Sequence, residues 1–404
     1  MKSKRKKLLV SSFLLWQDPE RVSLHFLTDF FIKKGFDVFW LTTPFSLFHF
    51  VKPTHLKEKG KLLNLSLKAG KEYKTGINNG TVINRAILSL VHPIDKIHFL
   101  NSYFLTENYL KFSYPSLKNL LKKYNFENPD IFMFDTNGLN GDIFQFIKPK
   151  FVIYRLNDKF SEFFQNVEKE AKGKFLFEKK SFQRADLILA VSKSLYDYAI
   201  SEKKDKTNVY LLPNGVDVDR FSEKRKEPLE YQKIPKPRAL YVGILSNWFD
   251  WNLIISVAKM NKKISFVIIG DGKVPKDLPK NIFILGPIAY EKMPAFMQYV
   301  DVGIIPFKNL PRMDTVERPL KFYQYLASGL PIVSTAYGKL KEGMSPYALF
   351  GNTPDEFSTA LQKALSFSQV EKDKLKEAAK QFSWDRIFEK LEKILKEVNP
   401  SLLA

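Results

Sequence analysis

The chain has 404 residues, of which 45% are hydrophobic and 26% charged, so it is long enough for two globular domains with full cores. It contains no cysteine, which excludes disulfides and thiolate metal sites and fits a cytoplasmic protein. The net charge of +21 is uneven, because residues 1–100 hold 17 Lys and Arg against 7 Asp and Glu. This excess predicts an anionic partner (nucleic acid, a phospholipid surface or a phosphorylated substrate) or a solvated lysine-rich surface.

The chain begins with a basic head and an apolar stretch, as a signal peptide does. No small-residue cleavage site precedes residues 17–20, QDPE, so we interpret KLLVSSF as a first buried strand. No apolar run approaches the roughly 20 residues of a membrane span.

Short apolar strands then alternate with amphipathic helices, the first helix lying near 22–34. The first half contains the predicted strands DVFWLT, IFMFD, FVIYRL, LILAVS and VYLLP. The pattern restarts with RALYVGIL, a helix at 251–260, ISFVIIG, NIFILG, a helix at 292–299, VGIIPF, a helix after Pro319 and PIVST. Such alternation predicts parallel sheets in two Rossmann-like domains, with ligands at the carboxyl ends of the strands.

We therefore divide the chain into four segments. Residues 1–212 form a first Rossmann-like domain, and the polar, proline-containing residues 213–238 form a linker. Residues 239–375 form a second Rossmann-like domain. Residues 376–404 contain a C-terminal helix that we expect to pack back toward the first domain.

The stretch RPLKFYQYLASGLPIVST, residues 318–335, places cations in the first turn of a helix. A helix N-terminus already carries positive partial charge, so Lys321 there needs either water or an anion to face. Gln324 is three residues on and shares a face with Lys321. Helix amides and one ammonium would hold a diphosphate well, although an exposed lysine is the common alternative.

Two further loops follow strands and could approach a ligand. Gly243 comes directly after a strand, where the absence of a side chain allows close approach. Gly286, Pro287 and Ile288 follow another strand, where main-chain groups could contact a base.

These residues carry a resemblance. The second half is similar to the nucleotide-sugar-binding domain of GT-B glycosyltransferases, and the first half resembles more narrowly the glucuronosyltransferase of xanthan assembly and its relatives. The motifs are LLPNGVD, YVGILSNWFD and RPLKFYQYLASGLPIVST in the second half, and SLHFLTDFFIKKG, LVHPID and YRLNDKF in the first. The resemblance implies an α/β GT-B fold of two Rossmann-like domains facing across a cleft, the first binding an acceptor.

The resemblance also implies roles. The phosphate-binding lysine of the family falls on Lys321 and a neighbouring glutamine contact on Gln324. Contacts of the main chain with base and ribose fall around Ile244, Leu245, Pro287 and Ile288. The anion at Lys321 is then the diphosphate of a nucleotide sugar, UDP-linked.

An inverting transfer needs a base to deprotonate the acceptor hydroxyl. Asp158 follows the strand FVIYRL, and the catalytic aspartate of the family falls on it; the alternative is a helix N-cap. Many retaining GT-B enzymes carry a pair of glutamates across the Pro319 helix. Here the second position is Gln324 and Val316 lies eight residues before it, which favours inversion over the retaining alternative.

No histidine pair has metal-ligand spacing, and we interpret Asp217-Val218-Asp219 as structural, so we expect no metal and no cofactor besides the UDP-sugar. His25, on the first helix, is a candidate for acceptor contact or a packing residue.

The basic first quarter includes an aromatic stretch. Phe45, Phe48 and Phe50 precede Lys52 and further lysines, a pattern suited to docking on anionic lipid, or to a buried cluster beside solvated charges.

We therefore expect a cytoplasmic glycosyltransferase, peripheral on the inner face of the plasma membrane. It would transfer a sugar, with glucuronic acid as the leading candidate, from a UDP donor to a lipid-linked saccharide in exopolysaccharide or envelope assembly. A nucleic-acid-binding protein is the rival from another class, but no nucleic-acid-binding motif is present and we expect no such partner. A GT-B-like sugar-nucleotide epimerase is a second rival.

Overall fold

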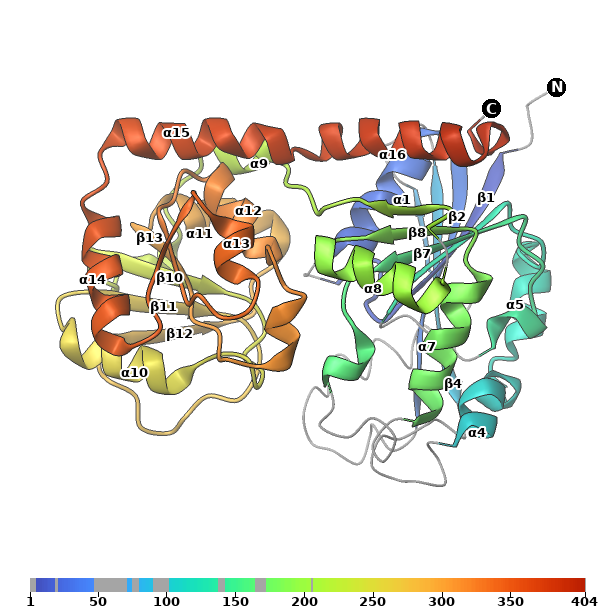
Figure 1. Ribbon diagram of the computed structural model, residues 1–404, viewed down its shortest axis with the longest axis horizontal. Helices are drawn as coiled ribbons and strands as arrows, with labels where there is room; N and C mark the ends of the chain where they lie inside the picture. The colour runs from blue at the N-terminus through green and yellow to red at the C-terminus, as the bar shows by residue number, and fades with distance from the viewer. Residues whose placement is uncertain are drawn as a thin grey trace. The chain divides into compact units, whose positions relative to one another are not determined.

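The computed structural model describes residues 5–18, 21–46, 71–74, 80–89, 102–136, 142–163, 172–204 and 206–403. The chain divides into two compact units, one made of 1–212 with 390–404 and the other of 213–389 (Figure 1). The boundary falls within helix α16 (Trp384–Val398). The end of this helix belongs to the first unit, where Glu392 pairs with Lys34 at 2.6 Å.

The first unit is built on a nine-stranded sheet in the described residues, with the order β3-β4-β2-β1-β6-β7-β8-β9 and β5 paired to β4. All strand pairs are parallel except those that β3 and β5 make with β4. The strands are β1 (Lys6–Ser12), β2 (Phe36–Ser46), β3 (Lys71–Lys74), β4 (Thr81–Ser89), β5 (Ser113–Tyr114), β6 (Ile131–Asp135), β7 (Phe151–Leu156), β8 (Leu187–Ala190) and β9 (Val209–Leu211).

Helices cover this sheet because each buries an apolar stripe against it. They include α1 (Ser23–Lys33), α4 (Tyr103–Asn108), α5 (Leu117–Tyr124), α7 (Lys172–Arg184) and α8 (Lys193–Lys203). The core is strongly aromatic: Phe134 and Tyr154 stack with ring centroids 4.9 Å apart, and Tyr154 meets Phe182 edge-on at 5.3 Å. The order of the central strands, β2-β1-β6-β7, brings the ends of β6 and β7 to one edge.

The second unit has a six-stranded, wholly parallel sheet in the order β12-β11-β10-β13-β14-β15. Its strands are β10 (Arg238–Val242), β11 (Ser265–Ile269), β12 (Ile282–Gly286), β13 (Val302–Ile305), β14 (Ile332–Ser334) and β15 (Ala348–Phe350). Its helices are α9 (Val218–Ser222), α10 (Trp251–Met260), α11 (Met293–Gln298), α12 (Leu320–Ala327), α13 (Leu340–Met344), α14 (Pro354–Leu365), α15 (Gln369–Ala379) and the start of α16.

The segment 213–238, which the sequence suggests as a linker, is packed into the second unit. Phe221 and Tyr231 are fully buried. The Arg238 guanidinium donates to the Ile234 carbonyl at 2.8 Å and to the Tyr231 carbonyl at 2.8 Å. A buried arginine needs such partners, so the segment is folded on the unit rather than free.

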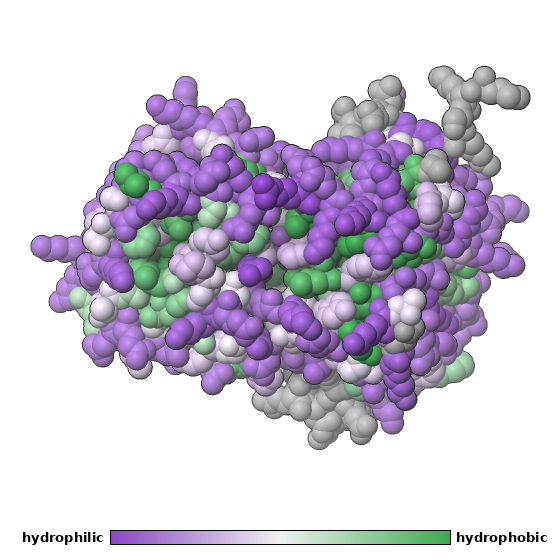
Figure 2. All heavy atoms as spheres, turned by 45° about the horizontal axis from the view of Figure 1, so that its top comes forward, coloured by the Kyte–Doolittle hydropathy of each residue, from purple (hydrophilic) through white to green (hydrophobic). Residues whose placement is uncertain are grey.

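The predicted α/β architecture of two Rossmann-like units is confirmed. Polar side chains dominate the face drawn in Figure 2, with apolar residues in smaller groups among them, as the composition suggests. Among the described residues, none of the helices combines the length and the apolar character needed to cross a membrane.

Candidate functional site

Three glycines meet where neighbouring strands of the second unit end. Gly243 follows β10, Gly270 follows β11 and Gly286 closes β12. The Gly243 amide donates to the Ile269 carbonyl at 2.9 Å, and the Gly270 amide donates to the Gly286 carbonyl at 3.0 Å. A Cβ on Gly270 would lie 1.9 Å from the Gly243 carbonyl oxygen, so only glycine allows the two loops to pack main chain to main chain.

Lys321 lies beside this glycine edge. It is in the first turn of α12, half-buried, with its ammonium 4.8 Å from the centroid of the Tyr241 ring and 4.7 Å from that of Phe307. A Cβ on Gly243 would lie 3.2 Å from Lys321 Nζ. The end of β10, the start of α12 and the Lys321 ammonium are therefore close together. Gln324 lies one turn further along α12.

The neighbouring cation has a different role. Arg318 Nε donates to the Gly343 carbonyl at 2.5 Å, and its guanidinium lies 5.5 Å from the centroid of the Phe382 ring. Pro319 is the N-cap of α12, and the helix begins at Leu320. Arg318 holds the fold, while Lys321 is at the sheet edge where a ligand can reach it.

The candidate main-chain contacts differ in accessibility. Ile244 is 43% exposed, and its carbonyl accepts a hydrogen bond from the Tyr241 hydroxyl at 3.0 Å. Pro287 is exposed and Ile288 half-buried. Leu245 is buried, and its amide donates to the Asp271 carbonyl at 2.7 Å. The surface residues are placed where a ligand could meet them, whereas Leu245 serves the core.

One pair at this edge was missed from the sequence. The Arg312 guanidinium lies 4.3 Å from the centroid of the Trp248 ring. The Trp248 carbonyl accepts from the Lys308 amide at 2.8 Å, which joins the loop after β10 to the loop after β13. Trp248 belongs to a stretch that the sequence singles out, but nothing in the pattern indicates its arginine partner.

In the first unit, Asp158 follows β7 and is half-buried. Its carbonyl accepts from Thr136 Oγ1 at 3.0 Å, and Thr136 comes directly after β6. Asn157 beside it accepts from the Ser23 hydroxyl at 3.0 Å. The 3-10 turn that follows starts at Phe160, whose amide donates to Glu178 Oε1 at 3.4 Å. Asp158 is thus held at the carboxyl edge of the first sheet, and Glu178 binds the Phe160 amide two residues after it.

Glu178 is a second residue that the sequence did not indicate. It lies on α7, is fully buried, and contacts the Tyr154 hydroxyl at 3.3 Å. Burial raises its pKa to about 8, although the hydrogen bonds from Phe160 and Tyr154 act in the opposite direction. A carboxyl group so close to the Asp158 loop belongs to the candidate site.

His25 lies in the core and not on a binding surface. It is fully buried; its Nδ1 accepts the Val22 amide at 3.3 Å and its Nε2 lies 3.1 Å from the Leu15 carbonyl oxygen. Burial, with a smaller contribution from Arg21, lowers its pKa to about 3, and its ring stacks on Trp16. Its position supports the packing interpretation instead of contact with acceptor or membrane.

The proposed lipid-docking stretch lies almost wholly outside the described residues. Phe48, Phe50 and Lys52 are outside them, and for Phe45 only the main chain, in β2, is described. Within the described ranges, no group of three or more His, Asp or Glu residues is arranged to hold a metal ion. Asp217 caps α9 and pairs with Arg220 at 3.0 Å, in line with the structural interpretation.

The second unit is similar in sequence to known glycosyltransferases. Residues 236–366 match the family model described as Glycosyl transferases group 1. TuaH of Bacillus subtilis strain 168, whose name assigns it to teichuronic acid biosynthesis as a glycosyltransferase, is 26% identical over 251 residues, covering 58% of this chain and 61% of TuaH.

Solved structures are similar over nearly the whole chain. A sucrose-phosphate synthase from Thermosynechococcus elongatus has a TM-score of 0.67 at 13% identity, covering 98% of this chain and all of that one. HepE of Anabaena, solved with UDP and glucose, has a TM-score of 0.62 at 13% identity, covering 97% of this chain and 100% of HepE. The chain has the GT-B fold, and residues 236–366 of its second unit match the glycosyltransferase group 1 model.

Proposed function

We propose that the protein is a glycosyltransferase that moves a sugar from a UDP-sugar to a hydroxyl group of a lipid-linked saccharide. The observation that carries the proposal is the position of Lys321 against Gly243 at the carboxyl edge of the second sheet. In open parallel sheets this edge is where ligands bind. The similarity of this region to a glycosyltransferase domain supports a nucleotide sugar as the ligand.

The chemistry of the edge suits a diphosphate. Lys321 supplies a full positive charge in the first turn of α12, where the helix dipole adds a positive partial charge. Exposed main chain and apolar surface at Ile244, Pro287 and Ile288 can accommodate the base and ribose. The solved HepE complexes with UDP and UDP-glucose support uracil as the base.

Transfer would proceed by inversion. The acceptor oxygen forms a bond to the anomeric carbon as the bond from that carbon to the diphosphate oxygen breaks, and the hydroxyl proton passes to the Asp158 carboxylate. The negative charge that develops on departing UDP is stabilised by Lys321 and the α12 amides, and the proposal includes no metal ion. A retaining hexosyltransferase is the alternative outcome, and product stereochemistry decides between them.

Isothermal titration with UDP tests the donor site. Lys321→Ala should weaken binding about ten- to a hundredfold, since a charge-assisted contact with phosphate is lost. Lys262→Ala is the matched control, because Lys262 is exposed and lies three residues before β11, at the amino-terminal edge of the same sheet. If the two variants bind UDP equally, Lys321 is not at the donor site.

The sugar is proposed to be glucuronic acid, and the acceptor to belong to polysaccharide assembly. The resemblance of the first half supports the sugar, and the name of the relative TuaH supports the polysaccharide. Titration of the wild type with UDP-glucose and UDP-glucuronate compares the donors directly. Tighter binding and turnover of UDP-glucose would replace glucuronic acid by glucose.

A lipid-linked acceptor requires access to a membrane, and the described residues include a surface suited to it. Phe104, Phe112 and Tyr114 are 70%, 48% and 56% exposed within eleven residues that also hold the exposed Lys111. Exposed aromatic rings near lysines suit the interface of an anionic bilayer.

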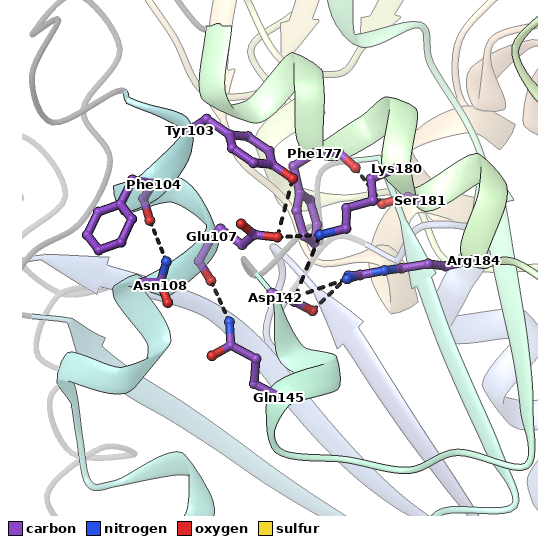
Figure 3. Close-up of polar contacts among 10 residues, drawn as sticks. All are labelled: Tyr103, Phe104, Glu107, Asn108, Asp142, Gln145, Phe177, Lys180, Ser181 and Arg184. Atoms are coloured by element: carbon purple, nitrogen blue, oxygen red, sulfur yellow. Dashed lines mark hydrogen bonds and ion pairs between the residues drawn. The ribbon is translucent and has the colours of Figure 1, made fainter.

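Acidic groups behind this surface are neutralised. Glu107 pairs with Lys180, while Asp142 accepts two hydrogen bonds from Arg184, at 2.7 and 3.0 Å, and Phe104 points away from this cluster (Figure 3). The charges that remain exposed on α4 and its neighbours are therefore mainly positive, as binding to anionic lipid requires. We propose on these grounds that the protein acts at the inner face of the plasma membrane.

Flotation with vesicles tests docking. The wild type should float at low salt with vesicles that contain phosphatidylglycerol, and the double variant Phe104→Ser, Phe112→Ser should float several-fold less. Leu229→Ser is the control, since Leu229 is 76% exposed in the second unit. Binding to nucleic acid without binding to UDP or vesicles would favour the rival class.

A further inference from the structure

A buried chain of polar side chains runs beneath the Asp158 loop. Glu178 Oε1 lies 3.3 Å from the Tyr154 hydroxyl, which lies 3.3 Å from Thr136 Oγ1. Thr136 in turn donates to the Asp158 carbonyl at 3.0 Å. The side chains of Glu178, Tyr154 and Thr136 are each at most 2% exposed. Glu178 also accepts the Phe160 amide, so it holds the Asp158 loop from two sides.

The number of hydroxyl protons available to these contacts indicates the protonation state of Glu178. Three contacts connect Glu178 with the Asp158 carbonyl, but Tyr154 and Thr136 supply only two hydroxyl protons. Thr136 uses its proton on the carbonyl, so Tyr154 can donate to Glu178 or to Thr136, not to both. A proton on Glu178 would let each group donate to the next, ending at Asp158.

The surroundings favour that protonated form. Glu178 Oε2 is buried and makes no hydrogen bond in the part of the chain that the structure describes. A carboxylate oxygen left so in the core is costly, whereas a carboxylic acid is tolerated. The charged and titratable groups around it are Tyr154 on β7, Lys159 in the loop, Glu162 in the 3-10 turn, and Tyr198 and Glu202 on α8. The Tyr198 hydroxyl also faces the Glu178 carboxyl as a hydrogen-bonding group. Lys159 is the one cation among these groups, and its ammonium lies over the Tyr198 ring.

Glu178 is the only acidic residue of α7, and two basic residues of the same helix have carboxylate partners elsewhere. Lys180 and Arg184 pair with Glu107 and Asp142, on the contacts drawn in Figure 3. They therefore do not supply a counter-charge to Glu178 in the described structure.

We propose that Glu178 is a positioning residue that, in its protonated form, fixes the Asp158 loop through the Phe160 amide and the Tyr154–Thr136 chain. This inference rests on the proposed function of Asp158 as the base. Loss of the Glu178 proton breaks the directional chain and puts a charge beside the loop, so Asp158 would no longer be held for proton transfer.

The test compares two substitutions at one position. Glu178→Gln keeps a donor and an acceptor without a charge, so kcat at neutral pH should stay within a few-fold of the wild type. The wild type should lose kcat above about pH 8, and this loss should be absent in Glu178→Gln. Glu178→Leu removes both contacts, and kcat should fall roughly ten- to a hundredfold while UDP affinity is unchanged.

Glu202→Gln is the matched control, because it removes a neighbouring carboxylate without touching the hydrogen-bond chain; the alkaline fall in kcat should remain. An alkaline fall that persists unchanged in Glu178→Gln, or full kcat in Glu178→Leu, overturns the proposal. A purely structural role would lower stability without altering the pH profile.

A readout without turnover separates this inference from the proposed function. With selective ¹⁵N-phenylalanine labelling, the Phe160 amide resonance should shift with a midpoint near pH 8 in the wild type and stay constant in Glu178→Gln. If no donor supports transfer but this titration is seen, the proposed reaction fails while the protonated anchor stands. If the resonance does not titrate in this range, the anchor is wrong whatever the enzyme does.

Discussion

The two candidate sites lie at the carboxyl edges of two parallel sheets, one in each unit, but different chemical groups form them. In the second unit the edge is main chain and glycine, with Lys321 as the charged group beside Gly243. In the first unit the loop of Asp158 rests on buried side chains, ending at Glu178. A site that holds a phosphorylated nucleotide can use amides and one cation, whereas a site that moves a proton needs a base in a fixed position.

The largest expected effect comes from a substitution that disables the Asp158 site of the first unit and leaves the Lys321 site of the second unit intact. Asp158→Asn should lower the rate of transfer by at least about a hundredfold, because the amide cannot accept the hydroxyl proton. UDP affinity should remain that of the wild type, since the donor contacts lie in the other unit. Initial rates with a labelled UDP-sugar and calorimetry with UDP measure the two quantities separately.

Asp197→Asn is the control for this change. Asp197 is exposed on α8 and forms a surface ion pair with Lys193, a kind of pair that contributes little to stability. Transfer by Asp158→Asn at the wild-type rate would remove Asp158 from the mechanism and leave the anchoring of its loop without a catalytic purpose.

The second unit's site consists of glycines and one lysine, whereas the first unit's site depends on buried side-chain contacts. This difference explains what could be predicted from the sequence. Apolar strands alternating with helices indicate parallel sheets, and a glycine directly after a strand or a lysine in the first turn of a helix is visible in the sequence itself. Gly243 and Lys321 were found in this way. Leu245 lies in the same loop, but its buried side chain and its bond to Asp271 depend on the fold of the neighbouring loop.

The first unit was harder because polar residues interrupt its patterns. Strand β4 was missed since Asn84 and Arg85 lie within it, and both are buried; Asn84 donates to Gln17 at 2.6 Å. Glu178 was missed for a similar reason, as a buried carboxyl on α7 looks like one more charge on a lysine-rich helix. Its partners come from β7 and from the loop after it, and local spacing carries no information on such contacts.

The glycine edge can be tested by stability. Gly270→Ala should destabilise the second unit by about 2–3 kcal/mol, since its φ of +151° suits glycine and its Cβ would clash with the Gly243 carbonyl at 1.9 Å. Gly286→Ala should cost about 1 kcal/mol, because its φ is +70° but no atom lies within 4 Å of the added Cβ.

Urea unfolding of the two alanine variants provides the measurement. Both positions have positive φ at the ends of adjacent strands, so the difference between them reports the contact of main chain with main chain together with the less accessible φ of Gly270. Equal destabilisation would show that backbone conformation alone requires these glycines, and that the two loops are not closely packed.

The last expected effect concerns acid, and it distinguishes the units again. All five histidines of the chain lie between residues 25 and 98, so the second unit contains none. Burial lowers the pKa of His25 from 6.5 to about 3. Between these values the unfolded chain binds more protons than the folded one, so stability falls as the pH drops from 6.5 toward 3 and is unaffected above 6.5.

His25→Gln should reduce this acid dependence, by at most about 1.4 kcal/mol per pH unit, because glutamine does not titrate but can accept from Val22 and donate to Leu15. Hydrogen exchange, corrected for intrinsic rates, measures it: wild-type protection of β1 and α1 should decline between pH 6.5 and 5 more steeply than that of the variant. Protection of β10 and β11 should be the same in both proteins. An equal decline of β1 and α1 in wild type and variant would mean that His25 titrates normally, and that the first unit buries no neutral imidazole.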